Sequence, residues 1–171
     1  MVHINIEIKA KITNPEQIRT ILKVKNADFK GEDHQIDTYF KVSKGKLKLR
    51  EGKIENDLIY YQREEETGPK QSNVIFFSFD PKSSLKDVLT KSLGVLGVVT
   101  KKREIYFIDN IKFHIDKIKE LGTFLEIEAR DEKGNIGKEK LIEQCNFFKN
   151  LFKISEKDLI SVSYLDLLKL N

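Results

Sequence analysis

Residues 5–11 decide the fold, and they read Asn-Ile-Glu-Ile-Lys-Ala-Lys, with polar and apolar side chains in strict alternation. Successive side chains of a β-strand point to opposite faces. The pattern therefore predicts a strand with Ile6 and Ile8 on one face and Glu7 and Lys9 on the other. The polar face mixes carboxylates with ammonium groups, and such a mixture suits a metal ion and a polyanion together.

The same alternation recurs along the chain, and it predicts a sheet of eight strands. Charged side chains fall at alternate positions in five later segments, which are 46–50, 59–65, 101–107, 112–118 and 124–130. We predict strands at about 2–12, 34–42, 46–54, 57–66, 73–80, 98–109, 111–119 and 121–131. Short hairpins join most of them, which favours an antiparallel sheet that closes into a barrel.

Helical patterns fill the gaps between the strands. Asn14 is a plausible N-cap that precedes Pro15, and the pattern predicts a helix from there through Leu22. Further helices are predicted from Ser83 or Ser84 to about Leu93, over 138–152 and over 161–170. The predicted fold is α+β: an eight-stranded antiparallel β-barrel, or tunnel, with helices packed on the outside.

Length and composition predict one soluble domain over 1–171. Charged residues make up 34% of the chain and hydrophobic residues 39%, which is typical of a globular protein. No apolar run approaches the ~20 residues of a membrane-spanning helix, and no signal peptide is visible. Cys145 is the sole cysteine, so no intrachain disulfide forms, and we expect a cytoplasmic protein. The sequence leaves open a monomer or a homodimer.

The charge balance argues against a nucleic-acid partner. The net charge is +4, but 27 acidic residues are interspersed with 31 basic ones and no long basic block occurs. A nucleic-acid binder usually concentrates its cations in a patch or stripe. The position of the cations therefore matters more than their number.

Two arrangements of the barrel satisfy the alternation. In the first, the apolar faces pack inward and the charged faces are ordinary solvated surface. In the second, the apolar faces pack outward against the helices and the charged faces line a wet tunnel. The pattern alone favours the first arrangement. In the second, cations from several strands converge in one enclosure, where they focus positive potential; they are Lys9, Lys11, Lys46, Lys48, Arg50, Arg63, Lys101 and Arg103.

The acidic residues of the same faces are candidate metal ligands. They are Glu7, Asp116, Glu126 and Glu128. Carboxylate oxygens suit Mg²⁺ or Mn²⁺, and such an ion would bridge them to phosphates.

At this point the sequence resembles a known family. Glu7-Ile8-Lys9 resembles the last three positions of the ExExK signature of the CYTH superfamily, the triphosphate tunnel metalloenzymes. Longer segments resemble its class IV adenylate cyclase branch in family order over nearly the whole chain; they are 34–40, 47–51, 60–63, 101–107, 113–116, 121–128 and 163–168.

The resemblance implies an eight-stranded tunnel that binds a triphosphate and a divalent metal ion, Mg²⁺ or Mn²⁺. It implies an enzyme most like an adenylate cyclase, which converts ATP to cyclic AMP and pyrophosphate. The alternatives are a triphosphatase for inorganic, nucleoside or thiamine triphosphate, and a binding module without chemistry. The residues that the resemblance marks as catalytic are Glu7, Lys9, Arg63 and Glu126.

One position departs from the family signature. Asn5 replaces the first Glu of the motif, so that position offers a carbonyl oxygen without a charge. We expect this change to affect metal affinity and turnover more than binding of the triphosphate.

Overall fold

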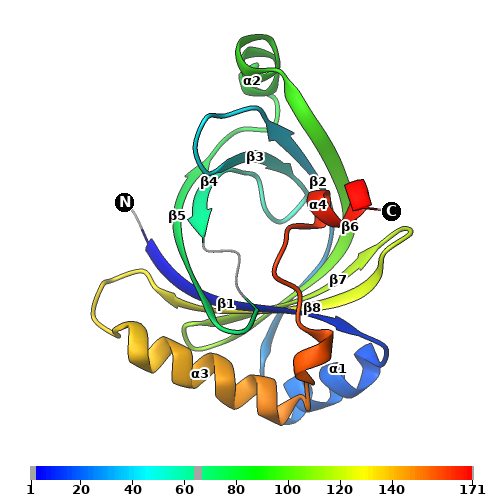
Figure 1. Cartoon of the computed structure of the whole chain (residues 1–171), viewed down its shortest axis with the longest axis vertical. Helices are drawn as coiled ribbons and strands as arrows, with labels where there is room; N and C mark the ends of the chain where they lie inside the picture. The colour runs from blue at the N-terminus through cyan, green and yellow to red at the C-terminus, as the bar shows by residue number, and fades with distance from the viewer. Residues whose placement is uncertain (1–2, 64–66, 171) are drawn as a thin grey trace.

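The computed structural model describes residues 3–63 and 67–170 (Figure 1). In chain order the elements are β1 (His3–Ile12), α1 (Pro15–Val24), β2 (Asp28–Phe40), β3 (Lys46–Glu51), β4 (Asp57–Arg63), β5 (Lys70–Ser78), α2 (Leu85–Leu93), β6 (Val95–Ile108), β7 (Ile111–Ile118), β8 (Gly122–Asp131), α3 (Lys138–Leu151), the short 3₁₀ helix η1 (Glu156–Asp158) and α4 (Tyr164–Leu170). Every predicted strand and helix is present. The predicted ends of the first and fourth strands, at residue 2 and at 64–66, lie outside the described residues.

The sheet is a closed barrel with the strand order β1-β5-β4-β3-β2-β6-β7-β8, and all its pairs are antiparallel. The pairing of β1 with β8 closes it, and Lys9 lies opposite Glu126 in that register. Closure removes the exposed edges that an open sheet of this length would present. The predicted α+β barrel is confirmed.

The apolar faces of β1, β7 and β8 point outward, which is the second of the two arrangements that the alternation allows. Ile6 and Ile8 of β1 belong to a buried cluster with Leu22 of α1 and with Leu141 and Phe148 of α3. In Figure 1, α1 and α3 lie against one side of the barrel, under β1 and β8. The polar faces of these strands are therefore left to the interior.

The helices cover only part of the barrel. Some outward side chains on the remaining strands stay exposed, for example Ile36 of β2 at 40% and Phe77 of β5 at 61%. Helix α2 has no buried residue and extends beyond the barrel (Figure 1). Within residues 3–63 and 67–170, no helix has both the length and the apolar character needed to cross a membrane.

Local signals explain where α1 begins. The Asn14 side chain accepts a hydrogen bond from the Gln17 backbone N–H, and Pro15 opens α1 as predicted.

Four starts differ from the prediction by three residues or more. β6 begins at Val95 rather than near 98, and α4 begins at Tyr164 rather than near 161. β2 begins at Asp28 rather than near 34, and β5 begins at Lys70 rather than near 73. The first residues of β2 and β5 lack an apolar alternation, so pairing with β6 and with β1 sets these two starts.

Candidate active site

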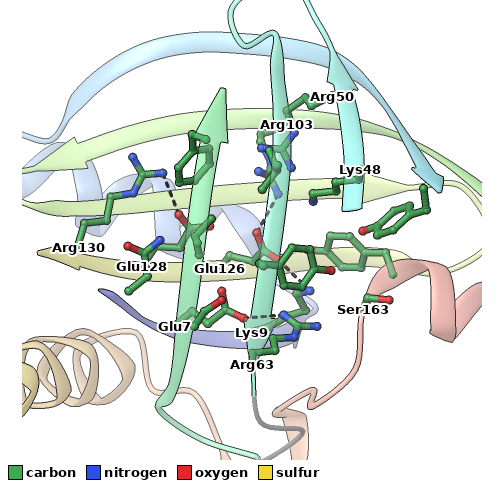
Figure 2. A pocket seen from close by; sticks show the side chains of 18 of the residues that line it. Glu7, Lys9, Lys48, Arg50, Arg63, Arg103, Glu126, Glu128, Arg130 and Ser163 are labelled. Carbon is green, nitrogen blue, oxygen red and sulfur yellow. Dashed lines mark hydrogen bonds and ion pairs between the residues drawn. The ribbon is translucent and has the colours of Figure 1, made fainter. Parts of the chain in front are cut away.

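A cavity lies inside the barrel, and charged side chains from five strands line it (Figure 2). The charged lining residues are Glu7, Lys9, Lys48, Arg50, Arg63, Lys101, Arg103, Glu126, Glu128 and Arg130. Seven of these are cations and three are carboxylates, so the described lining is net positive. Low-dielectric walls around a charged lining of one predominant sign concentrate the potential and attract an anion.

Glu126 of β8 pairs with two of the lining cations. Lys9 Nζ lies 2.9 Å from its Oε1, and Arg103 Nη2 donates to its Oε2 at 2.8 Å. His114 Nδ1 is 3.1 Å from the same Oε2. Burial raises the pKa of Glu126, but the charges of Lys9 and Arg103 lower it by more than burial raises it. The net pKa is well below the usual value. Glu126 is therefore a carboxylate at neutral pH.

Two further ion pairs connect the lining acids to cations. Arg63 Nη1 of β4 donates to Glu7 Oε1 at 2.5 Å, between strands that are not neighbours in the sheet. Arg130 Nη2 donates to Glu128 Oε2 at 3.1 Å. Figure 2 shows both pairs, with Arg63 facing Glu7 from another strand and Arg130 beside Glu128 on β8. The free volume left between the side chains is about 70 Å³, so a bound phosphate chain must take over donors that the carboxylates now hold.

A fourth acid, Asp37 of β2, holds three cations in place and is not among the predicted site residues. Its Oδ1 accepts from Arg50 Nε at 2.9 Å, and its Oδ2 accepts from Lys48 at 2.9 Å and from Lys101 at 2.6 Å. Burial raises its pKa, but Arg50, Lys101 and Lys48 lower the pKa well below the usual value. Its position within segment 34–40 was the available sequence signal, whereas its place opposite Arg50 follows from the pairing of β2 with β3.

Asp116 does not line the cavity. It is fully buried, and it accepts two hydrogen bonds from Arg103 and one from the Tyr164 hydroxyl at 2.9 Å. The sequence predicted a metal ligand here, but the contacts in the structure are those of a group that orients Arg103.

The structure leaves two other predicted cations out of the cavity. Lys11 is exposed at the end of β1 and lines a separate surface depression with residues 12–14. Lys46 forms an ion pair with Asp166 and donates to Ser163 Oγ at 3.2 Å, so it fastens the C-terminal segment. Both lie on the polar faces of their strands but beyond the part of the barrel that encloses the cavity.

Besides Asp37 and His114, further residues of the site are not among the predicted ligands. Arg130 and Tyr164 line the cavity, and Lys112 and Glu55 form an ion pair at one end of the barrel. Arg130 and Lys112 share the alternation of Glu128 and His114, which is a signal that could have identified them. Glu55 lies in a turn, where no periodic signal exists.

The donor set fits a divalent metal ion. Glu126, Glu128 and His114 each offer a ligand atom, and these atoms lie within 4.8 Å of one another. Burial, Arg103 and Lys112 lower the pKa of His114 to about 4, so its imidazole is neutral and able to coordinate at pH 7. Nearby, the buried Asn5 Oδ1 has no hydrogen-bond partner among the described residues. Carboxylate and amide oxygens suit Mg²⁺ or Mn²⁺, and the imidazole favours Mn²⁺ of the two.

The chain is similar to several known proteins over nearly its whole length. A protein of Methanocaldococcus jannaschii named "Putative adenylate cyclase MJ0240" is 28% identical, over 96% of this chain and 98% of its own. The PH1012 protein of Pyrococcus horikoshii has the same fold, with a TM-score of 0.79 at 24% identity over 95% of this chain and 98% of its own. The Hippeastrum protein HpAC1, described as a "putative adenylyl cyclase" with "a dominant" triphosphatase activity, has a TM-score of 0.62 at 13% identity over 98% and 95% of the two chains.

The family assignment rests on the sequence. The profile of the CYTH domain matches residues 3–164, nearly the whole chain. The closed barrel and its charged interior agree with this match. We conclude that this protein belongs to the CYTH domain family.

Proposed function

We propose that the protein is a metal-dependent enzyme that acts on a triphosphate, most like a class IV adenylate cyclase. The observation that carries the proposal is the convergence of seven cations, from five strands, on one cavity that also holds a carboxylate pair beside a neutral imidazole. Arginine forks and lysine ammonium groups hold phosphate oxygens. The name of the Methanocaldococcus relative supports the cyclase reaction.

In this proposal Lys9, Arg63 and Arg103 bind the β and γ phosphates and stabilise the negative charge that develops on the departing pyrophosphate. The ribose 3′-hydroxyl attacks the α phosphorus, the bond to pyrophosphate breaks, and the hydroxyl proton passes to the departing pyrophosphate. Glu126, Glu128 and His114, with Glu7 and Asn5 nearby, would hold the divalent ion. When bound, the ion supplies Lewis-acid stabilisation of phosphate charge.

Hydrolysis of the triphosphate is a second candidate, and one observation favours it. Tyr39 and Tyr61 line the cavity, and Lys48 Nζ lies over both rings, 5.5 and 5.8 Å from their centroids, so the rings already carry a cation and offer little free face to a nucleobase. A cavity that binds phosphates without stacking the base suits attack by water on the terminal phosphorus. The activity described for the Hippeastrum protein agrees with this candidate.

One assay tests both candidates. The protein is incubated with ATP or inorganic triphosphate and Mg²⁺ or Mn²⁺, and the products are separated. Cyclic AMP with pyrophosphate identifies a cyclase, and free phosphate identifies a hydrolase. We expect Glu126→Gln and Arg103→Ala to lose activity at least ~100-fold, while Lys102→Ala, the exposed neighbour on the opposite face of β6, retains it.

Two outcomes contradict the enzyme proposal. Tight calorimetric binding of triphosphate without turnover would make the protein a binding module. Absence of both binding and turnover would remove the triphosphate as its ligand.

A further inference from the structure

One end of the barrel is occupied by the turn between β3 and β4, residues 52–56, and we call this end the turn mouth. A cavity of about 250 Å³ lies there. It shares Asn5, Arg50, Phe76 and Arg130 with the cavity inside the barrel, so the two adjoin. A chain of phosphates that outgrew the interior would enter this space.

The opposite end is covered by the C-terminal segment. The Ile160 backbone N–H donates to the Lys9 carbonyl at 2.8 Å, and Lys70 Nζ donates to the Ile160 and Ser161 carbonyls at 3.2 and 3.0 Å. Tyr164 then lines the interior cavity from this side. A bound chain therefore extends toward the turn mouth.

Glu55 spans the turn mouth. Its Oε2 accepts from Arg50 Nη1 at 3.2 Å and from Gln35 Nε2 at 2.8 Å, and its Oε1 pairs with Lys112. Arg50 belongs to β3 and Lys112 to β7, and two strands, β2 and β6, separate them in the barrel. The carboxylate thus connects distant parts of the rim and occupies cations that would otherwise bind phosphate.

The backbone of the turn is fixed as well. Asp33, which is fully buried, accepts from the Lys53 backbone N–H at 2.7 Å and from the Glu55 backbone N–H at 3.2 Å. A Cβ at Gly52 would lie 2.3 Å from Asp33 Oδ2, so a glycine is required for this close approach. Glu55 is therefore held in one place and is not a freely moving rim side chain.

The charge on Glu55 is retained. Burial raises its pKa, but Arg50 and Lys112 lower the pKa well below the usual value. The ionised carboxylate neutralises Arg50 and Lys112, so these cations offer little net attraction to a further phosphate. A neutral nucleoside attached to the third phosphate does not need these cations.

We propose that Glu55 determines the length of phosphate chain that the tunnel accepts, admitting triphosphates and rejecting long-chain inorganic polyphosphate. The inference rests on the proposed binding of triphosphate. It adds a specificity-determining residue at the turn mouth, away from the carboxylates that would hold the metal ion.

The test compares affinities for two ligands, inorganic triphosphate and long-chain linear polyphosphate, by calorimetry. In Glu55→Gln, which keeps the shape of the side chain and removes its charge, we expect the ratio of polyphosphate affinity to triphosphate affinity to rise at least ~10-fold. Glu132→Gln is the matched control, because Glu132 lines the same cavity but contacts neither Arg50 nor Lys112 among the described ion pairs. Its ratio should match that of the unaltered protein.

Three outcomes overturn the inference. An unchanged ratio in a folded Glu55→Gln protein removes the role of Glu55 and leaves triphosphate binding intact. Equal affinity of the unaltered protein for triphosphate and polyphosphate also contradicts the inference. This measurement needs no variant, so the inference can be tested even if Glu55→Gln fails to fold. Absence of triphosphate binding contradicts the proposed function itself, and the inference falls with it.

Discussion

The guanidinium of Arg103 binds both carboxylate oxygens of Asp116, through Nε at 2.6 Å and Nη2 at 2.5 Å. The two side chains are 2% and 0% exposed, on the adjacent strands β6 and β7. A paired fork of this kind fixes the plane of the guanidinium. The same Nη2 also reaches Glu126 at 2.8 Å, so Asp116 determines where Arg103 presents its donors to the cavity.

Asp116→Asn should therefore weaken binding of triphosphate roughly 10-fold or more and change Mn²⁺ affinity little. Glu128→Gln should do the reverse, because Glu128 belongs to the cluster that fits a metal ion. Separate calorimetric titrations with Mn²⁺ and with triphosphate measure the two effects. A loss of Mn²⁺ affinity in Asp116→Asn as large as that in Glu128→Gln would restore Asp116 as a ligand.

Gly97→Ala should destabilise the docking of the C-terminal segment. A Cβ at residue 97 would lie 2.5 Å from Leu165 Cδ1, and Leu165 is 5% exposed. Overpacking of this size costs about 1–3 kcal/mol of unfolding free energy. Urea unfolding measures it, and the cost should shrink when Leu165→Ala is already present. Equal costs in both backgrounds would show that the two residues do not interact.

The stability contributed by Asp131 should disappear in acid. Its carboxylate accepts from the backbone N–H groups of Asn135, Ile136 and Gly137 at 2.9, 3.1 and 3.1 Å, just before α3. The hydrogen bond from Gly137 is the main reason that its pKa is lowered. A lowered carboxyl pKa stabilises the fold above the unfolded pKa of about 3.9, and this contribution is lost as pH falls through the folded value.

Unfolding of the unaltered protein and of Asp131→Asn, measured from neutral pH down to acid, checks this dependence. The stability difference should be full at neutral pH and shrink below about pH 4. Glu132→Gln, at an exposed neighbouring carboxylate, is the control and should show no such difference. A gap that stays constant with pH would contradict the prediction.

Cys145 should not react with thiol reagents in the folded protein. Its side chain is fully buried, and its Sγ–H donates to the Ile6 carbonyl at 3.2 Å. Burial raises the pKa of this thiol to about 12, which leaves almost no thiolate at pH 8. Labelling with a disulfide reagent should be absent in buffer and reach one thiol per chain in guanidinium. Rapid labelling under native conditions would show that α3 separates from the barrel.

Alternation in the sequence predicted the strands and the polar face of each, because a two-residue period assigns a face to each side chain. It put Lys9 and Arg103 on polar faces, and both side chains line the cavity. The choice between a dry and a wet interior needed the family resemblance, since both arrangements have the same period. Lys11 shows what alternation leaves open. Odd or even position along a strand determines the face of a side chain, but it does not show where along the strand the cavity ends.

Contacts between distant strands could not be predicted from one strand at a time. Asp37 acquires its three cations only when β2, β3 and β6 are brought together. Glu55 lies in a turn whose path depends on Asp33, twenty-two positions away from it in sequence. Such residues become visible only after closure of the sheet fixes the register.

That closure also constrains how the chain folds. β1, the first strand, finds its partner β8 at residues 123–131, so the ring stays incomplete until most of the polypeptide is available. Pairings between ends so far apart in sequence slow folding. During synthesis on the ribosome, β1 is made long before its partner β8. A nascent chain halted before β8 would leave Lys9 without Glu126, the carboxylate that neutralises it.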